Sequence, residues 1–352
     1  MRILAIETSC DETSAAIIEG VNGTVRILSN VVGSQIKIHT RYGGVVPELA
    51  ARRHAELIIS VISEAFRTAD DREKNSSNLR SFYIDAVAVT YGPGLMVALL
   101  VGVEVAKSLS YAWNKPCIAV NHLEGHVYSV LAKRAEENTW SAFLAEPFIS
   151  LVVSGGHTEL LMVNGYGKYT VLGRTRDDAA GEAFDKVAKM IGLSYPGGPA
   201  LAREAASGNP LAFEMPRAMR ESGDFDFSFA GIKTWVKNLL ASRDKDTMPI
   251  CDIAASFQEA VCDILVAKTI AAARRSNVER VVVTGGVSAN ERLREKFGEA
   301  AAQTKIACYF PAKSLTGDNA GMIGIAGYLK YLHTKKFDDI FTIRPNPDLK
   351  WG

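Results

Sequence analysis

The 352-residue sequence has little of the features that mark several specialised protein classes. It has only five cysteines, at positions 10, 117, 251, 262 and 308, with no CxxC pair among them, and an odd number cannot all pair within one chain. This pattern excludes a small secreted domain held together by disulfides. Reduced thiols in a cytosol are the expected state.

Strong charge of either sign and long apolar runs are also missing. Forty Lys and Arg residues stand against 39 Asp and Glu residues, so the formal net charge is +1. No global field therefore draws the chain to nucleic acid or to an anionic membrane, and any polyanion must meet a local patch. Met1–Glu7 has no basic flank before a long apolar stretch, and no run reaches the roughly 20 apolar residues of a membrane span. We predict a cytoplasmic protein with no membrane partner.

What the sequence does contain is an internal repeat. Arg2–Thr13 (RILAIETSCDET) resembles Phe148–Glu159 (FISLVVSGGHTE), because each is an apolar strand that ends in a small, polar turn. Ile84–Gly94 and Val278–Ala289 form a second pair, in which buried-strand patterns end in Thr and Gly. Two pairs in the same order predict a duplicated α/β fold whose two lobes bind a ligand in a central cleft at the strand ends.

The remaining segments fit this two-lobe organisation. A hydrophobic content of 47% over 352 residues suits two lobes, expected at residues 1–140 and 141–352. Apolar residues at helical spacing predict three helices, at residues 45–66, 95–113 and 253–273. Polar and Gly-rich composition predicts loops at residues 71–81 and 208–226 and an extended tail at residues 341–352.

Two histidines four residues apart are the sharpest local signal. In NHLEGH, which begins at Asn121, His122 and His126 would project from one face of a helix, and that spacing suits two ligands of one metal ion. Two ordinary packing histidines would give the same pattern. Asp318, in LTGDNAGMIG, is the candidate third ligand, although an Asp before an apolar helical segment also suits a helix N-cap. Two imidazoles and one carboxylate would leave positions open for substrate and favour Fe²⁺ or Zn²⁺ over Mg²⁺ or Ca²⁺.

Glycine-rich turns form a second candidate constellation. Ser154-Gly155-Gly156 ends an apolar strand, so its backbone N–H groups would be able to approach a phosphate, although ordinary turns have the same composition. In residues 177–199, several acidic residues precede an amphipathic helix expected to end at the turn PGGP. One carboxylate there, the small Gly198 and the amide of Asn290 would together suit a nucleoside pocket.

Ten ordered motifs give the chain a nearly end-to-end resemblance to the TsaD family. The motifs are ETSCDETS, RYGGVVPELAARRH, GPGL, NHLEGH, VSGGHTEL, DDAAGEAFDK with YPGGP, FSFAGIKT, SFQEAV, GGVSAN and GDNAGMIG. The resemblance implies the duplicated two-lobe fold of the actin/Hsp70/sugar-kinase (ASKHA) superfamily. It also implies transfer of threonylcarbamoyl from threonylcarbamoyl-AMP to the N6 amine of adenosine 37, 3′ of the anticodon, in tRNAs that read ANN codons.

The resemblance further implies ligands and residue roles. His122, His126 and Asp318 fall on the positions of the family's metal ligands, for one divalent ion, Fe²⁺ or Zn²⁺. The implied nucleotide is threonylcarbamoyl-AMP, or ATP, ADP or AMP in the same site. Its implied contacts are Val152, Val153, Ser154, Gly155, Gly156, Asp185, Gly198 and Asn290. Asp11 and Glu12, beside the first turn, are candidate general bases, although acids at a strand end also serve as caps.

The implied partners are tRNA, a TsaB-like paralogue, a TsaE-like ATPase and a TsaC-type enzyme that supplies the adenylate. For tRNA, the candidate local patches are Arg52-Arg53, Lys133-Arg134 and Arg274-Arg275, although solvated helix faces have the same composition. The chain departs from the family's usual pattern at three positions, Arg174, Ala98 and Gly317. None of these departures removes a predicted ligand.

Three other functions fit parts of the pattern. A metal-dependent protease would use the histidine pair with Glu124 as base, but position i+2 lies on another side of the helix. A small-molecule kinase of ASKHA type would bind ATP at the strand turns, with Glu7-Thr8-Ser9 where such kinases often carry Asp and Gly. A noncatalytic scaffold would not need the metal ligands, so their presence disfavours that function.

Overall fold

The computed structural model describes residues 1–72, 84–132, 140–242 and 248–351. They form two compact units. Unit 1 comprises Met1–Glu146, Gly165–Gly167 and Pro311–Gly352, and unit 2 comprises Pro147–Asn164 and Lys168–Phe310. This division differs from a single boundary at residue 140, because the C-terminal segment packs with the N-terminal strands and so belongs to unit 1.

Unit 1 is built on a five-stranded sheet with the order β3-β2-β1-β4-β5. Its strands are β1 (Arg2–Glu7), β2 (Glu12–Val21), β3 (Thr24–Ser34), β4 (Ala86–Gly92) and β5 (Cys117–Asn121). Strand β1 pairs antiparallel with β2 and parallel with β4, which pairs parallel with β5. Strands β1 and β4 are almost wholly buried, as expected for central strands with helices on both faces.

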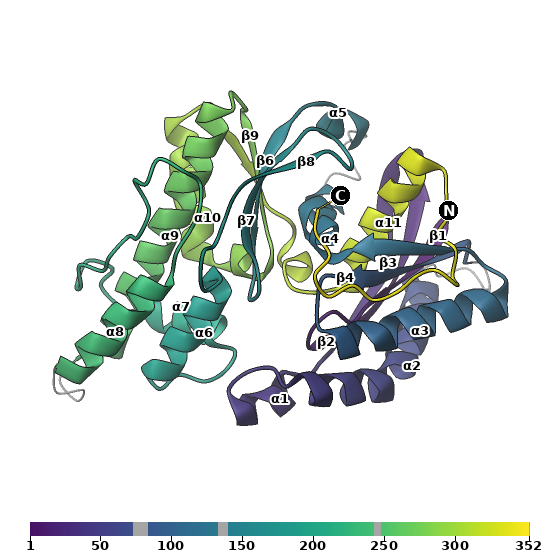
Figure 1. The fold of residues 1–352 in the computed structure, drawn as a ribbon, viewed down its shortest axis with the longest axis horizontal. Helices are drawn as coiled ribbons and strands as arrows, with labels where there is room; N and C mark the ends of the chain where they lie inside the picture. Colours follow the sequence, from purple (N-terminus) through teal and green to yellow (C-terminus); the bar gives the residue numbers. More distant parts are fainter. Residues whose placement is uncertain (73–83, 133–139, 243–247, 352) are drawn as a thin grey trace. The chain divides into compact units, whose positions relative to one another are not determined.

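Helices cover both faces of this sheet. Side chains alternate along β1, so Leu4 and Ile6 pack in the cluster of α2 (Pro47–Arg72) and α3 (Met96–Trp113), whereas Ala5 faces α11 (Ala320–Thr334). A Cβ atom at Gly324 would lie 2.8 Å from Ile18, so only glycine lets α11 approach the sheet this closely. Figure 1 shows α11, the last helix of the chain, beside the first strand.

Helix α3 is apolar and long enough to cross a membrane by length and composition alone. Helices of globular proteins also reach this length and composition, and α3 packs against β4 and α2 through buried residues that include Leu99, Val103 and Ala106. One face of α3 is thus buried, while Leu100 and Tyr111 are exposed, as in a helix that covers one face of a sheet.

Unit 2 repeats the topology of unit 1, with the strand order β10-β9-β6-β7-β8. Its strands are β6 (Phe148–Val153), β7 (Thr158–Val163), β8 (Tyr169–Arg174), β9 (Arg280–Thr284) and β10 (Ala307–Tyr309). Strand β6 pairs antiparallel with β7 and parallel with β9, as β1 does with β2 and β4. The predicted duplication of an α/β fold is therefore confirmed.

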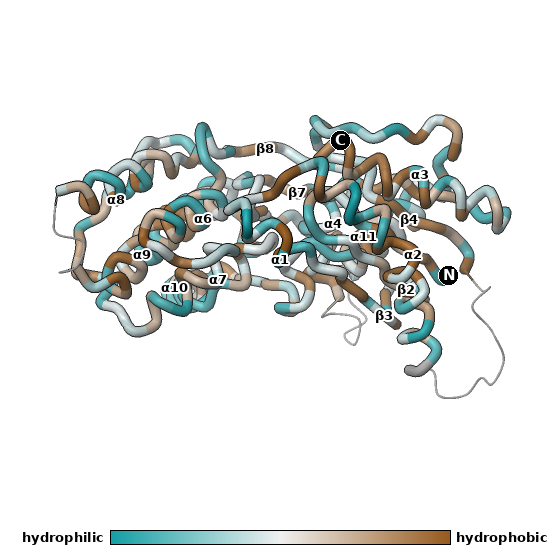
Figure 2. Tube along the Cα trace, turned by 90° about the horizontal axis from the view of Figure 1, so that it is seen from below, coloured by the Kyte–Doolittle hydropathy of each residue, from teal (hydrophilic) through white to brown (hydrophobic). Residues whose placement is uncertain are grey.

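The helices of unit 2 pack around a second hydrophobic core. They are α6 (Ala180–Met190), α7 (Gly197–Ala205), α8 (Ala230–Ser242), α9 (Ile250–Arg275) and α10 (Glu291–Gln303). Phe184 of α6 meets Phe257 of α9 edge to face, with ring centroids 5.1 Å apart. Figure 2 shows hydrophobic and hydrophilic residues alternating along α6, as expected for a helix with one buried face. Helix α9 is buried on all sides over Ile253–Cys262.

The predicted helices at 45–66, 95–113 and 253–273 are confirmed as α2, α3 and α9. The predicted loop at 208–226 contains no helix or strand. Of the loop predicted at 71–81, residues 71 and 72 instead form the end of α2, and the rest lies outside the described residues. The tail predicted as extended contains turns at residues 341–342 and 347–348. It lies over the end of β4, where Asn346 N donates to Tyr91 O at 2.7 Å and Gly94 N to Pro347 O at 3.3 Å.

Candidate metal centre and nucleotide pocket

Strand β5 leads directly into α4 (His122–Tyr128), so the helix predicted for NHLEGH is confirmed. Asn121 caps this helix, because its Oδ1 accepts a hydrogen bond from Leu123 N at 2.9 Å. Its Nδ2 donates to Lys350 O of the tail at 3.2 Å. The helix places His122 and His126 on one face, with ring centroids 4.7 Å apart and ring planes at 84°.

Asp318 meets the two histidines from the far end of the chain. The N-cap of α11 is Asn319, whose side chain accepts from Met322 N at 3.0 Å, so Asp318 does not cap the helix. Its Oδ1 lies 3.5 Å from His122 Nε2 and 3.2 Å from His126 Nε2. Gly125 permits this approach, because a Cβ there would lie 2.8 Å from Ile323 of α11.

These three side chains fit a metal ion. One ligand atom from each lies within 4.8 Å of the other two. Tetrahedral Zn²⁺ with bonds of 2.0–2.2 Å separates its ligand atoms by about 3.3 Å, and the two measured distances to Asp318 Oδ1 bracket that separation. Both histidines are buried, whereas the Asp318 side chain is 23% exposed, so the cluster opens towards solvent on the carboxylate side.

Glu7, at the end of β1, holds the outer nitrogen of His122. Its Oε2 lies 3.1 Å from His122 Nδ1 and accepts a hydrogen bond from Thr90 Oγ1, while its Oε1 accepts from Ser9 N. Burial alone would lower the pKa of His122, but the charges of Glu7 and Asp318 outweigh it and raise that pKa to about 9. The site therefore favours a positive charge, and a carboxylate behind the histidine is the usual support of a metal-binding imidazole.

We expect Glu7→Gln to weaken metal binding by about 10- to 100-fold, the usual effect of losing a carboxylate behind a metal ligand. The amide keeps the volume of Glu7 but removes the charge that attracts a cation and orients His122. Metal affinity measured by competition with a chelator dye checks this expectation. Unchanged affinity in a folded variant would show that Glu7 serves only the packing of β1.

Asp11 and Glu12 lie beside this cluster, at the start of β2. Burial and then the charge of Asp318 raise the pKa of Asp11. Burial also raises the pKa of Glu12 to about 7, against the weaker opposing effect of its bond from Ser34 Oγ, which lies 2.9 Å from Oε1. Among the described residues, Glu12 Oε2 is buried without a hydrogen-bond partner. Glu12 is therefore poised to exchange a proton near neutral pH.

Glu12→Gln should stabilise the metal-free protein at pH 8 but not at pH 4. The pKa of Glu12 is about 7 in the folded chain and 4.5 as its ordinary value, so the contribution of Glu12 to wild-type stability falls as pH rises from 4.5 to 7 and then levels. Because one pKa unit corresponds to about 1.4 kcal/mol, the variant should gain about 2 to 3 kcal/mol at pH 8. Urea unfolding at both pH values measures this gain, with the exposed Glu48→Gln as control. An equal gain at both pH values would contradict it.

Unit 2 contains a cavity of about 760 Å³. Four of the residues predicted for nucleotide binding line it, namely Gly155, Asp185, Gly198 and Asn290. These residues come from the turn after β6, from α6, from the start of α7 and from the turn before α10. The fold thus brings together residues that are up to 135 positions apart in the sequence.

The segment at residues 177–199 folds differently from its prediction. Asp185 lies within α6, not before it, and the glycines of PGGP begin α7 instead of forming the turn that ends α6. Pro196 favours this start, because proline cannot continue a helix yet is tolerated at its beginning. Asp185 Oδ1 accepts from Gly197 N at 2.7 Å and Gly198 N at 3.2 Å, so it caps α7.

The turn after β6 is only partly at the cavity. Val152 and Val153 are fully buried within β6 and do not line it, and neither do Ser154 and Gly156. Ser154 N donates to His157 O at 2.8 Å, which closes the turn. No atom would lie within 4 Å of a Cβ at Gly155 or Gly156, so their backbone faces open space.

Three further residues that line the cavity, Gln258, Glu259 and Arg292, were not among the residues predicted from the sequence. Gln258 Oε1 accepts from Asn290 Nδ2 at 2.7 Å, while Asn290 Oδ1 caps α10 by accepting from Leu293 N. Arg292 pairs with Glu259 through Nε at 2.8 Å. The motif SFQEAV contains Gln258 and Glu259, but only the packing of α9 beside α10 shows their place in the pocket.

At the three departures from the family's usual pattern, backbone atoms make hydrogen bonds to other residues. Ala98 O accepts from Thr8 Oγ1 at 3.0 Å, Gly317 O accepts from Asn319 Nδ2 at 2.8 Å, and Arg174 N donates to Asp226 Oδ1 at 3.0 Å. A different side chain at each position leaves these contacts in place.

Comparison with known proteins agrees with this architecture. The family model described as TsaD, tRNA N6-adenosine threonylcarbamoyltransferase, matches residues 26–325. A relative of that description from Clostridium kluyveri is 47% identical over 100% of this chain and 98% of its own length. Another from Geobacter sulfurreducens is 48% identical over 93% of this chain and 91% of its own length.

Solved structures with low sequence identity share the fold. HypF from T. kodakarensis aligns with a TM-score of 0.61 at 17% identity, over 94% of this chain and 48% of that chain. An activator of 2-hydroxyisocaproyl-CoA dehydratase from Clostridium difficile aligns with a TM-score of 0.52 at 15% identity, over 96% of this chain and 99% of its own. By its full-length similarity, the chain belongs to the TsaD family of tRNA N6-adenosine threonylcarbamoyltransferases.

Proposed function

We propose that this chain transfers threonylcarbamoyl from threonylcarbamoyl-AMP to the N6 amine of adenosine 37 in tRNAs that read ANN codons. The observation that carries the proposal is the convergence of His122 Nε2, His126 Nε2 and Asp318 Oδ1 in a chain similar over its full length to threonylcarbamoyltransferases. In the reaction, a C–N bond forms between N6 and the carbamoyl carbon, the bond from that carbon to the AMP oxygen breaks, and N6 loses a proton.

The metal ligands in this proposal are His122, His126 and Asp318, for one Fe²⁺ or Zn²⁺. A set of two imidazoles and one carboxylate suits these ions and leaves coordination positions open. When bound, such an ion would supply Lewis-acid polarisation of a carbonyl oxygen. Glu7 fixes the ring of His122 through Nδ1, so that Nε2 points to the common centre.

The adenosine part of the donor occupies the cavity of unit 2. The carboxylate of Asp185 binds a ribose hydroxyl. It also accepts hydrogen bonds from Gly197 N and Gly198 N, and so positions these two glycines beside the base. Gly155 offers backbone N–H to the phosphate, and Asn290 adds an amide contact. AMP is a good leaving group, so orientation and charge stabilisation are the main tasks of the protein.

The proton released from N6 passes to Glu12 or Asp11. Burial raises the pKa values of both carboxyls, and that of Glu12, at about 7, lies close to the pH at which a general base works best. The proposed partners are tRNA, a TsaB-like paralogue, a TsaE-like ATPase and a TsaC-type supplier of the adenylate, and the proposed location is the cytoplasm.

Reconstitution tests this function. The protein and its partners are incubated with threonylcarbamoyl-AMP and unmodified tRNA, and digested nucleosides are analysed by mass spectrometry. We expect threonylcarbamoyladenosine to form only when donor, tRNA and protein are all present. Absence of the product, together with cut peptides from unfolded protein or a phosphorylated small molecule, would favour the protease or the kinase function instead.

A further inference from the structure

A second hollow lies along the same two helices as the nucleotide cavity. It measures about 430 Å³ and is lined mainly by α9 and α10. Glu259 and Glu295 line the nucleotide cavity, whereas Asp263 and Glu299, each four residues further along its helix, line the second hollow. One turn of helix thus separates the two, and we call the second hollow the distal groove.

The acidic residues of the distal groove are already paired with cations. Asp263 accepts from Arg217 Nε at 2.7 Å and from Lys296 Nζ at 2.5 Å. Glu299 accepts from Arg292 Nη1 at 3.0 Å. Neither carboxylate is therefore left to neutralise a further cation in the groove.

Two arginines of the distal groove have no such partner. Arg220 and Arg274 are both exposed, and neither guanidinium makes an ion pair or hydrogen bond within the described part of the chain. Each guanidinium carries five N–H donors whose planar geometry matches phosphate oxygens. Gln303 adds an amide to the same lining. The groove therefore presents two unpaired positive charges, and a polyanion complements it.

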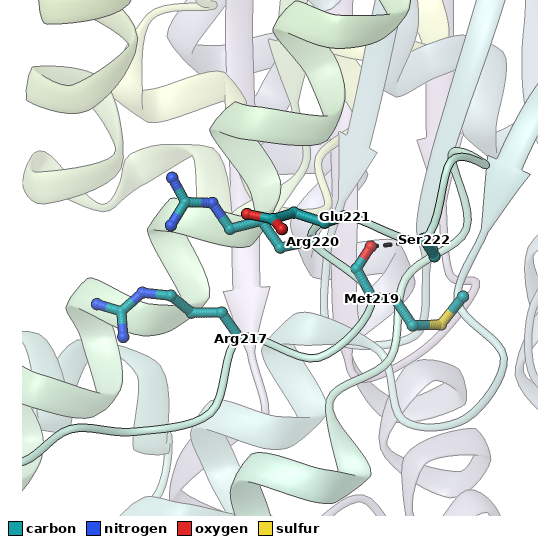
Figure 3. Close-up of a pocket in the computed structure, with 5 residues that line it drawn as sticks. All are labelled: Arg217, Met219, Arg220, Glu221 and Ser222. Carbon is teal, nitrogen blue, oxygen red and sulfur yellow. Dashed lines mark hydrogen bonds between the residues drawn. The ribbon is translucent and has the colours of Figure 1, made fainter.

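Hydrogen bonds from the buried Lys268 of α9 fix the loop that carries Arg220. Lys268, only 2% exposed, donates from Nζ to Ser222 Oγ at 2.8 Å and to Asp224 O at 2.9 Å. Ser222 Oγ in turn donates to Met219 O at 2.9 Å, and Figure 3 shows Arg217 and Arg220 extending to the same side of this loop. An anchored loop loses little entropy when a ligand binds its side chains.

Glu221 is the acidic neighbour of Arg220. It is exposed and, together with Arg220, lines the separate hollow of about 440 Å³ whose lining residues Figure 3 shows, but it does not line the distal groove. Of the other predicted basic patches, Arg52-Arg53 has Arg53 paired with Glu56 at 2.7 Å, and Lys133-Arg134 lies outside the described residues.

We infer that the distal groove binds backbone phosphates of the tRNA substrate through Arg220 and Arg274. This inference rests on the proposed function, which makes tRNA the substrate. With a net charge of only +1, the chain has no general attraction for RNA, so phosphate binding depends on local positive charge such as this pair of guanidiniums beside the nucleotide cavity. The contacts carry affinity and orientation, and they read no base sequence.

The test compares Arg220→Gln/Arg274→Gln with the wild-type protein in tRNA binding over a range of salt concentrations. Each lost phosphate contact should lower the slope of log affinity against log salt by about one, so the variant should lose about two and bind about tenfold more weakly at moderate salt. The control Lys168→Gln/Lys336→Gln removes the same charge from two exposed lysines elsewhere and should leave binding nearly unchanged.

Two further readouts separate this inference from the proposed function. Transfer by the variant at saturating tRNA should match the wild type, and its affinity for AMP should not change. If the wild type transfers threonylcarbamoyl but the variant keeps its salt slope, the groove is no RNA site. Equal weakening by the lysine control would indicate a nonspecific charge effect, and displacement of tRNA by inorganic phosphate at matched ionic strength would indicate a single-anion site. Each outcome overturns the inference while leaving the proposed function intact.

Discussion

Replacing His122 and His126 together by Ala is expected to abolish metal binding and to lower the transfer rate by about 1000-fold or more. Only Asp318 of the three converging groups would remain, and one carboxylate does not hold Fe²⁺ or Zn²⁺ against solvent. A Lewis acid stabilises a developing negative charge by several kcal/mol, and about 4 kcal/mol corresponds to about 1000-fold in rate. Metal content by plasma mass spectrometry and single-turnover transfer measure the two effects.

His333→Ala is the matched control, because His333 belongs to the same unit but stacks on Tyr166 away from the cluster. It should keep both metal and activity. The metal content and transfer rate of Asp318→Asn should lie between those of the double histidine variant and those of His333→Ala, since the amide keeps one oxygen but loses the charge. A double variant that binds no metal yet transfers at the wild-type rate would refute a catalytic role for the cluster.

Asp185→Ala is expected to weaken nucleotide binding by about 30-fold or more. Asp185 lines the cavity, and its Oδ1 accepts two backbone hydrogen bonds that begin α7. Hydrogen bonds to charged groups contribute about 1.5 to 3 kcal/mol each, so losing one to a ribose hydroxyl gives an effect of that order. Calorimetric titration with AMP measures the change, and thermal unfolding shows the added cost of the lost cap.

Asp185→Asn separates the two roles of this residue. The amide oxygen can still accept from Gly197 N and Gly198 N, so the stability of unit 2 should recover, whereas the charge directed at the ribose is lost. We therefore expect near wild-type thermal stability with weakened nucleotide binding. Wild-type AMP affinity in both variants would remove Asp185 from the nucleotide site.

Local patterns predicted the parts of the fold that local physics determines. The spacing of apolar residues in α2, α3 and α9 follows from helix geometry, and the repeat of strand and turn motifs reflects the duplicated sheet. The spacing of His122 and His126 follows from helix geometry alone. The place of residues 311–352 in unit 1 was not predictable in this way, because it depends on packing between α11 and strands more than 300 residues earlier.

The site could be predicted only in part for the same reason. The residue pattern suited Asp318 equally as a metal ligand and as a helix N-cap. Only the structure, in which Asn319 caps α11 and Asp318 lies beside His126, distinguishes the two roles. The contact of Glu7 with His122 and the pairing of Glu259 with Arg292 join residues that are distant in the sequence, so no local sequence pattern predicts them. The start of α7 was missed, because glycines after proline suit a turn and a helix start equally.

The central claim is that His122, His126 and Asp318 hold one ion, and X-ray absorption spectroscopy of the metal-loaded protein tests it most directly. The geometry predicts two imidazole nitrogens at about 2.0–2.1 Å and one carboxylate oxygen at about 2.0–2.2 Å, with the imidazole signal lost in His122→Ala/His126→Ala. A spectrum without imidazole scattering, or one unchanged in that variant, would contradict the claim.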